Sequence, residues 1–160
     1  MPITDFPIPE RNSEQVIINP FALLSLNQVL RESLQPLYEK ASVVIRCESL
    51  PSVYGQYDEL LRLFGMMLNL ITGESPAGPK LFLYVDCDQG VTEPELEAGM
   101  RRFIIKFYTN ITTGEAWREK NKNILSGCES IVSLHKGTFQ VNNISHTGCL
   151  FAISLAGKFA

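Results

Sequence analysis

The chain lacks the features that mark membrane and secreted proteins. Its longest apolar stretch, residues 60–71, is interrupted by Arg62, Gly65 and Asn69 and is too short to cross a bilayer. No basic segment leads into an apolar one at the start, so we expect a cytoplasmic protein without membrane insertion. The 160 residues, 45% hydrophobic and 19% charged, are typical of a single globular domain with one core.

Charge and cysteine usage exclude several further classes. The formal net charge of -3 argues against binding to nucleic acid, which needs a basic surface. No C-x-x-C pair occurs, so the cysteines favour buried free thiols over a zinc or redox site. His146 and Cys149 supply only two of the four ligands of a tetrahedral metal site, and we expect no metal ion.

Hydrophobic periodicity predicts alternating strands and helices. Residues 1–19 are expected to form an N-terminal arm that contains a short strand, and residues 20–160 the rest of a single domain. The remaining predictions are helices over 25–41, 57–72, 94–108 and 123–137, strands over 15–19, 43–49, 80–86, 138–144 and 149–157, and a turn over 51–55. This order predicts a two-layer α/β sandwich, whose mixed, mostly antiparallel sheet is covered by helices on one face.

Several local signals refine these elements. Ser25 or Asn27 can cap the helix over 25–41, and Gly73 ends the helix over 57–72. The strand over 80–86 is apolar on both faces, which predicts a central place in the sheet. Residues 109–115 are expected to form a mobile connection. The helix over 123–137 is closed by Gly137.

The segment Asp86-Cys-Asp-Gln-Gly90 follows a predicted strand and carries acidic groups at a turn. With Glu97 it imitates a calcium-binding loop of the EF-hand type. That loop needs glycine at its sixth position and a helix before it, whereas this chain has Val91 and a strand. A calcium site is therefore not predicted.

Five stretches together resemble the ATP-binding catalytic domain of sensor histidine kinases, in order and at matching spacings over residues 20–157. They are SLNQVLRESLQPLYEKASVVI, LPSVYGQYDELLRLFGMMLNLI, IIKFYT, IVSLHKGTFQV and GCLFAISLAG. The resemblance implies the fold shared with gyrase-type ATPases and heat-shock chaperones. It also implies positions for the family's nucleotide motifs.

Two of these motifs are absent. The family's N-x-x-x-N, which reaches Mg²⁺ and the phosphates, aligns with Met66 and Leu70, and neither side chain ligates a hard cation. The glycine-rich lid motif aligns with residues 122–124, Lys-Asn-Ile, which contain no glycine to hold phosphate on backbone amides. Met66 and Leu70 would line the presumed pocket, which is either filled or an apolar cavity for another ligand.

The other two motifs are partial. The family's D-x-G-x-G, whose aspartate reads adenine, aligns with the segment from Asp86 to Gly90, in which Asp88 replaces the first glycine. A carboxylate there disfavours an anionic nucleotide. In the last motif Gly148 remains, followed by Cys149 where threonine is common. Asp86, Gly90 and Gly148 are therefore the candidate remnants of a nucleotide site.

The resemblance leaves two functions open. The favoured one is a degenerate histidine-kinase-like ATPase domain that acts as a non-catalytic signalling or protein-interaction module, binds no cofactor, and has a sensor kinase, a response regulator or a second copy as its partner. The alternative is the ATP-binding catalytic domain of a two-component sensor histidine kinase, with ATP and Mg²⁺ bound and Asp86 on the adenine. Trp117 and Tyr108 would be either interface anchors or locally packed side chains.

Overall fold

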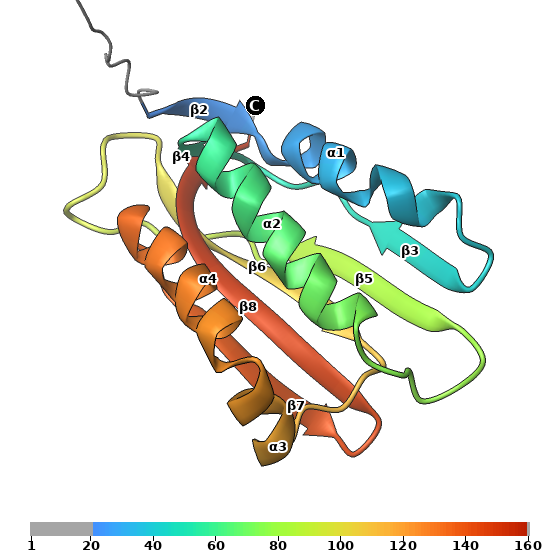
Figure 1. Ribbon diagram of the computed structural model, residues 1–160. Coiled ribbons are helices and arrows are strands. Elements are labelled where there is room, and N and C mark those ends of the chain that lie inside the picture. Colours follow the sequence, from blue (N-terminus) through green and yellow to red (C-terminus); the bar gives the residue numbers. More distant parts are fainter. Residues whose placement is uncertain (1–20, 160) are drawn as a thin grey trace, which may run out of the picture.

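The computed structural model describes residues 21–159, which form one seven-stranded sheet with helices on one of its faces (Figure 1). Along the sheet the strand order is β2-β4-β8-β6-β5-β3, and β7 pairs with β8. Only β3 and β5 are parallel neighbours; the other pairs are antiparallel. The strands are β2 (Ala22–Ser25), β3 (Val43–Cys47), β4 (Ser52–Gly55), β5 (Leu81–Cys87), β6 (Arg101–Thr109), β7 (Phe139–Ser145) and β8 (Gly148–Lys158). The predicted two-layer α/β fold is confirmed.

Four helices belong to the described part of the chain: α1 (Leu26–Tyr38), α2 (Tyr57–Thr72), α3 (Glu115–Lys120) and α4 (Lys122–Leu134). Ser25 caps α1, because its hydroxyl accepts a hydrogen bond from the Gln28 amide at 3.3 Å. The other candidate cap, Asn27, joins α1 to the chain after β3: its side chain accepts from the Leu50 amide and donates to the Glu48 carbonyl. Gly73 ends α2, as predicted.

The core lies between the sheet and α1, α2 and α4 (Figure 1). Strand residues alternate, so that every second side chain points toward the helices. The Phe64 ring of α2 meets Phe107 of β6, with 5.9 Å between centroids. Phe103 and Phe151 are equally buried on β6 and β8. No helix within residues 21–159 is long and apolar enough to span a membrane.

The prediction of a helix over 94–108 is wrong, because most of that stretch is β6. Phe103, Ile105 and Phe107 are buried at every second position, whereas Ile104 is 39% exposed on the other face. The period is therefore that of a strand, and pairing with β5 and β8 on both sides fixes it. The mixture of apolar residues on both faces concealed this period in the sequence.

Short strands were also missed. The predicted turn over 51–55 contains β4, and β2 lies just before α1; the two pair with each other, Ala22 opposite Gly55. Each has four residues, too few for an alternation to show. The strand predicted over 15–19 and most of the N-terminal arm lie outside the described residues. β5 does have neighbours on both sides, but its second face is open, and Phe82 is 51% exposed there.

The end of α4 differs in detail from the prediction. The helix ends at Leu134, and Lys136, not Gly137, takes the left-handed conformation with φ of 58°. Gly137 is needed for another reason: a Cβ there would lie 1.9 Å from the Ser154 carbonyl oxygen. The absence of a side chain lets the chain after α4 enter the sheet beside β8.

Candidate functional site

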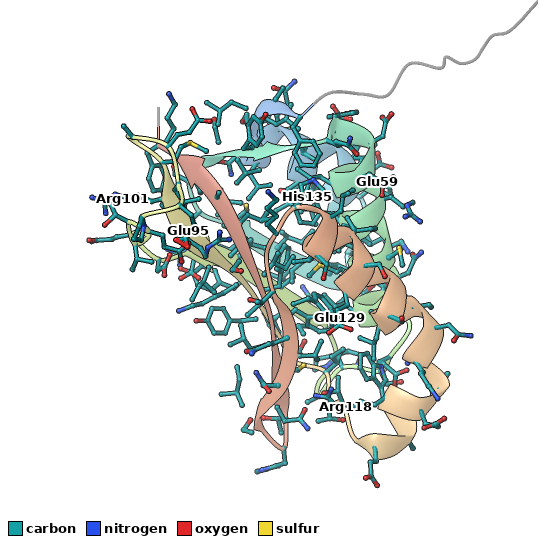
Figure 2. The ribbon with its side chains drawn as sticks, turned by 90° about the vertical axis from the view of Figure 1, so that its left-hand side faces the viewer. Glu59, Glu95, Arg101, Arg118, Glu129 and His135 are labelled. Carbon is teal, nitrogen blue, oxygen red and sulfur yellow. The ribbon has the colours of Figure 1, made fainter. Side chains whose placement is uncertain are left out.

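The structure does not bring the candidate nucleotide residues together. Gly90 lies against Arg101 and Phe103, and Arg101 pairs with Gly157 near the end of β8. Gly148 begins β8, at the opposite end of the sheet. With ~3.4 Å per residue along a strand, the two glycines are on the order of 25 to 30 Å apart. Figure 2 labels Arg101, which lies beside Gly90 at one end of the sheet.

The segment from Asp86 to Gly90 has a local structural role. Asp88 accepts hydrogen bonds from the Gly90 and Ile104 amides at 3.1 and 3.0 Å, which fastens the turn to β6. Gly90 has φ of 78°, a conformation that favours glycine. Asp86 lies on the face of β5 away from the helices, since Val85 is the buried neighbour. One of its carboxylate oxygens is buried without a hydrogen-bond partner in the described chain.

Met66 and Leu70 lie on α2, where their surroundings are filled. A Cβ on Gly127 of α4 would lie 2.6 Å from the Met66 methyl carbon, so Met66 occupies the place of that missing side chain. Leu70 is only 3% exposed and belongs to the core. Next to Gly127, burial raises the pKa of the Cys128 thiol to about 11, which the Arg62 charge opposes only in part. The α2–α4 contact is therefore closely packed and apolar.

Gly148 does not have Asp86 and Gly90, the other candidate nucleotide residues, as its neighbours. It lies beside the end of β6, where Thr109 pairs with Cys149. A Cβ on Gly148 would be 3.6 Å from the Thr109 carbonyl oxygen. The segment that follows, residues 110–114, therefore begins beside Gly148 at this end of the sheet, which we call the lower end. The sequence predicts residues 109–115 only as a mobile connection.

Hydrogen bonds within the chain close the lower end. The Asn143 side-chain oxygen accepts from the Thr113 amide and hydroxyl at 3.1 and 2.9 Å, and its NH₂ donates to the Thr113 carbonyl at 2.6 Å. The Thr113 hydroxyl also lies 3.6 Å from the Cys149 sulfur. Thr113 is 1% exposed, and Cys149 is fully buried. Together these groups fix the predicted connection onto the β7–β8 hairpin.

Asn110 is likewise engaged on both sides of its amide. Its NH₂ donates to the Lys80 carbonyl at 2.9 Å, and its oxygen accepts from the Phe82 amide at 2.8 Å. Its backbone carbonyl accepts from Ala77 at 2.7 Å. The side chain thus holds the start of β5 and the loop before it. One N–H and one oxygen lone pair of the amide are thus used within the chain.

The segment after Gly114 packs inward as α3. Trp117 is buried, with its ring edge-on to Phe151 at 6.2 Å between centroids, so local packing describes it and not an exposed anchor. Tyr108 lies on the open face of the sheet, where its ring stacks on Tyr84 at 5.8 Å. Lys120 lies 3.6 Å from Glu74, beyond the end of α2. That ion pair is largely exposed and contributes little stability.

Titratable groups do not gather into a metal site in the described part of the chain. Residues 21–159 contain no group of three or more histidine, cysteine, aspartate or glutamate side chains that could hold a metal ion. His135 is buried at the end of α4, labelled in Figure 2. One ring nitrogen faces the Ile131 carbonyl at 2.8 Å and the other accepts from the Gln56 amide at 3.1 Å. The ring is therefore fully used in joining α4 to the start of α2.

The described chain has the fold of the ATP-binding catalytic domains of histidine kinases. It is similar to the nucleotide-free catalytic domain of the histidine kinase ThkA, with a TM-score of 0.67 and 13% identity over 86% of this chain and 98% of that one. The histidine kinase AdeS of Acinetobacter baumannii gives a TM-score of 0.60 and 17% identity over 89% and 70%. The ATP-binding domain of PrrB from Mycobacterium tuberculosis gives 0.60 and 12% over 86% and 97%.

Sequence comparison adds nothing to this structural similarity: no family model and no curated protein matches the chain. At identities of 12 to 17%, the likeness establishes the fold. Function does not follow from fold and has to be argued from the groups present at the site.

Proposed function

We propose that this domain is a degenerate histidine-kinase-like ATPase domain, which acts as a non-catalytic signalling or protein-interaction module and in which ATP binding is weak or lost. The observation that carries the proposal is the closed lower end of the sheet. There Asn143 is hydrogen-bonded to Thr113, and Cys149, the residue after Gly148, is buried beside the Thr113 hydroxyl.

The position of the adenine motif supports this reading. Motifs that bind one nucleotide must converge in space, and Gly148 is the glycine that remains of the family's closing motif. The segment that converges with it runs from Asn110 to Gly114, which has the length of D-x-G-x-G. Asn110 stands at the place of the aspartate, and its amide is already bound to β5 and the preceding loop. The segment from Asp86 to Gly90 is too distant to share a ligand with Gly148.

The phosphate and magnesium positions support it as well. The candidate ligand positions on α2 carry thioether and hydrocarbon side chains, and Met66 fills the space over Gly127. An oxygen-poor, filled site cannot coordinate Mg²⁺, which requires near-octahedral oxygen ligands. Residues 122–124, aligned with the glycine-rich lid motif, form the first turn of α4, and the preceding helix α3 packs through Trp117 onto β8. The groups that would neutralise a triphosphate are therefore not assembled.

An interaction role is favoured by the open face of the sheet. Val44 of β3 and Phe82 of β5 lie opposite each other and are 39% and 51% exposed. Tyr84 is the next residue of β5 on that face, with its ring stacked on Tyr108 and the Arg46 guanidinium 5.4 Å from its ring centroid. Contiguous exposed apolar side chains on a protein surface mark interaction sites. The partner we propose is a sensor kinase, a response regulator or a second copy of the chain.

Isothermal titration with Mg·ATP tests the loss of nucleotide binding. We expect no heat of binding at millimolar nucleotide. A nucleotide-binding histidine kinase domain under the same conditions serves as the positive control, and ATP without Mg²⁺ separates nucleotide from metal effects. Micromolar binding would support the alternative, an ATP-binding catalytic domain of a two-component sensor histidine kinase.

A further inference from the structure

β3 is the last strand at one margin of the sheet (Figure 1). Within residues 21–159 it pairs only with β5, in parallel. The Glu48 amide, just after β3, donates to the Val85 carbonyl of β5 at 2.9 Å, so the even-numbered residues of β3 direct their backbone groups toward β5. Val43, Ile45 and Cys47 therefore direct theirs outward, along an edge with which no other described strand pairs.

This edge lacks the protection that sheet edges usually have. Charged side chains and covering groups normally keep an exposed edge from pairing with another chain. On the edge strand β7, the Arg118 guanidinium donates to the Val141 carbonyl. The only charged side chain of β3, Arg46, is instead held over its own sheet: it donates to Glu48 at 2.7 Å and lies 5.4 Å from the Tyr84 ring centroid. Arg46 therefore does not shield the outer edge of β3.

The outward backbone groups of β3 are self-complementary. β3 has five residues, and its middle residue, Ile45, is one that directs both its N–H and its C=O outward. A second copy laid antiparallel about a two-fold axis at Ile45 therefore overlaps the whole strand. The Ile45 amides then donate to the Ile45 carbonyls of the other copy, and the Cys47 amides donate to the Val43 carbonyls. The register leaves out the Val43 amide, which already donates to the Lys40 carbonyl at 3.1 Å, and the Cys47 carbonyl.

We propose that β3 pairs in this register with β3 of a second copy, so that two sheets become one across a two-fold axis. Side chains on the helix side favour the pairing, because Val43, Ile45 and Cys47 are only half-buried in the single chain. Ile45 lies beside Ile45 of the second copy, and Val43 lies beside Cys47. A hollow of about 220 Å³ between α1 and the end of β3, lined in part by Leu34 and Cys47, borders Val43 of the second copy.

Side chains on the open face fit the same register. Val44 lies beside Arg46 of the second copy, so no like charges face each other, and the aliphatic stem of Arg46 can cover Val44. Val44 and Phe82 are an exposed apolar pair, and the two-fold axis brings the pairs of both copies to one continuous face. Closed two-fold contacts of this kind are the commonest in homo-oligomers. The pairing rests on the interaction role proposed above and makes the second copy its partner.

Sedimentation equilibrium of the full chain tests the dimer. We expect a reversible monomer–dimer equilibrium with a dissociation constant of about 1 to 100 µM, because the contact is small. Val44→Glu places a carboxylate beside Arg46 of the second copy, and Val44→Lys places a like charge there, twice in each dimer. We expect the dissociation constant of the lysine variant to be about 10-fold or more above that of the glutamate variant. Circular dichroism checks that both variants are folded.

Disulfide trapping locates the two-fold axis. In a hydrogen-bonded antiparallel pair the Cα atoms are about 5.5 Å apart, which is within the range of a disulfide. Ile45→Cys should therefore give a covalent dimer on oxidation, linked through the introduced thiols as identified by mass spectrometry of its peptides. Val44→Cys is the matched control. Position 44 faces Arg46 of the second copy, and its own counterpart lies diagonally at about 7 to 8 Å, so this variant should cross-link much less.

Three results would overturn the proposal. The first is a monomer at every concentration up to about 500 µM. Protected Ile45 and Cys47 amides in hydrogen exchange would then assign the edge to a segment of the same chain, and unprotected ones would leave it to a different protein. The second is a dimer that both Val44 variants weaken equally, and the third is equal cross-linking of the two cysteine variants.

Failure of the dimer can be told apart from failure of the proposed loss of nucleotide binding. A monomeric chain that binds no Mg·ATP would overturn the β3 pairing alone. A dimer that binds Mg·ATP with micromolar affinity would overturn the loss of nucleotide binding and keep the pairing.

Discussion

Removal of the Asn143 side chain tests whether the lower end of the sheet is held closed as the structure shows. Asn143→Ala deletes three hydrogen bonds and leaves the Thr113 amide and carbonyl without these partners in a residue that is 1% exposed. A buried polar group left unsatisfied costs about 1 to 3 kcal/mol. The Thr113 hydroxyl keeps its contact with the Cys149 sulfur, and water can reach the vacated place because Asn143 is exposed, so we expect a loss of about 1 to 2 kcal/mol in the free energy of unfolding.

Urea denaturation followed by circular dichroism measures this loss. Asn142→Ala is the matched control, because Asn142 is the preceding residue on the same strand, is exposed like Asn143, and has no side-chain hydrogen bond within the described residues. It should change the free energy of unfolding by no more than about 0.5 kcal/mol. If Asn143→Ala cost no more than the control, the hydrogen-bonded closure would not contribute to the fold, and the main support for a closed site would fail.

Three further outcomes follow from single contacts. Gly55→Ala places a Cβ 2.7 Å from the His135 ring, so we expect the free energy of unfolding to fall by about 1 to 3 kcal/mol. In a double-mutant cycle with His135→Ala, the two losses should be less than additive. Full additivity would contradict the contact. Burial raises the pKa of Cys128 from 9.0 to about 11, so the unfolded chain releases this proton first as pH rises. The free energy of unfolding should therefore fall between pH 9 and 11 by up to about 1.4 kcal/mol per pH unit. Urea denaturation at a series of pH values should show a shallower decline for Cys128→Ala. An equally steep decline in that variant would refute the assignment to Cys128. The Met66 methyl group lies over Gly127 but can move aside, and leucine favours the helix more than glycine does. Gly127→Leu should therefore destabilise the domain by only about 1 kcal/mol in thermal unfolding, and a stabilising effect would show that the space is free.

The elements that could be predicted from the sequence were those with a strong local signal. α2 begins at Tyr57 and ends at Thr72, as predicted, because a broad apolar stripe and Gly73 define it without help from the rest of the chain. The β7–β8 hairpin is local in the same sense. β6 could not be told from a helix, since its strand period becomes visible only when β5 and β8 lie on either side.

Which segments converge at the candidate nucleotide site depends on strand register, which a single sequence does not reveal. Asp86 to Gly90 matches a nucleotide motif in spacing, yet strand register decides which segments converge, and the register places Asn110 to Gly114 beside Gly148. One signal was present: had residues 101–109 been predicted as a strand, Asn110 and Gly114 would have followed it at the motif's spacing. The closure by Asn143 leaves no trace in the sequence, because the pair is 30 residues apart.

The most direct test of a lost nucleotide site is a titration of the ¹⁵N-labelled domain with Mg·ATP, followed at the Gly148 and Thr113 amides. Closed surroundings predict that neither resonance moves at millimolar nucleotide. Saturable shifts of both amides with micromolar affinity would show that a nucleotide enters beside Gly148 and would contradict the account.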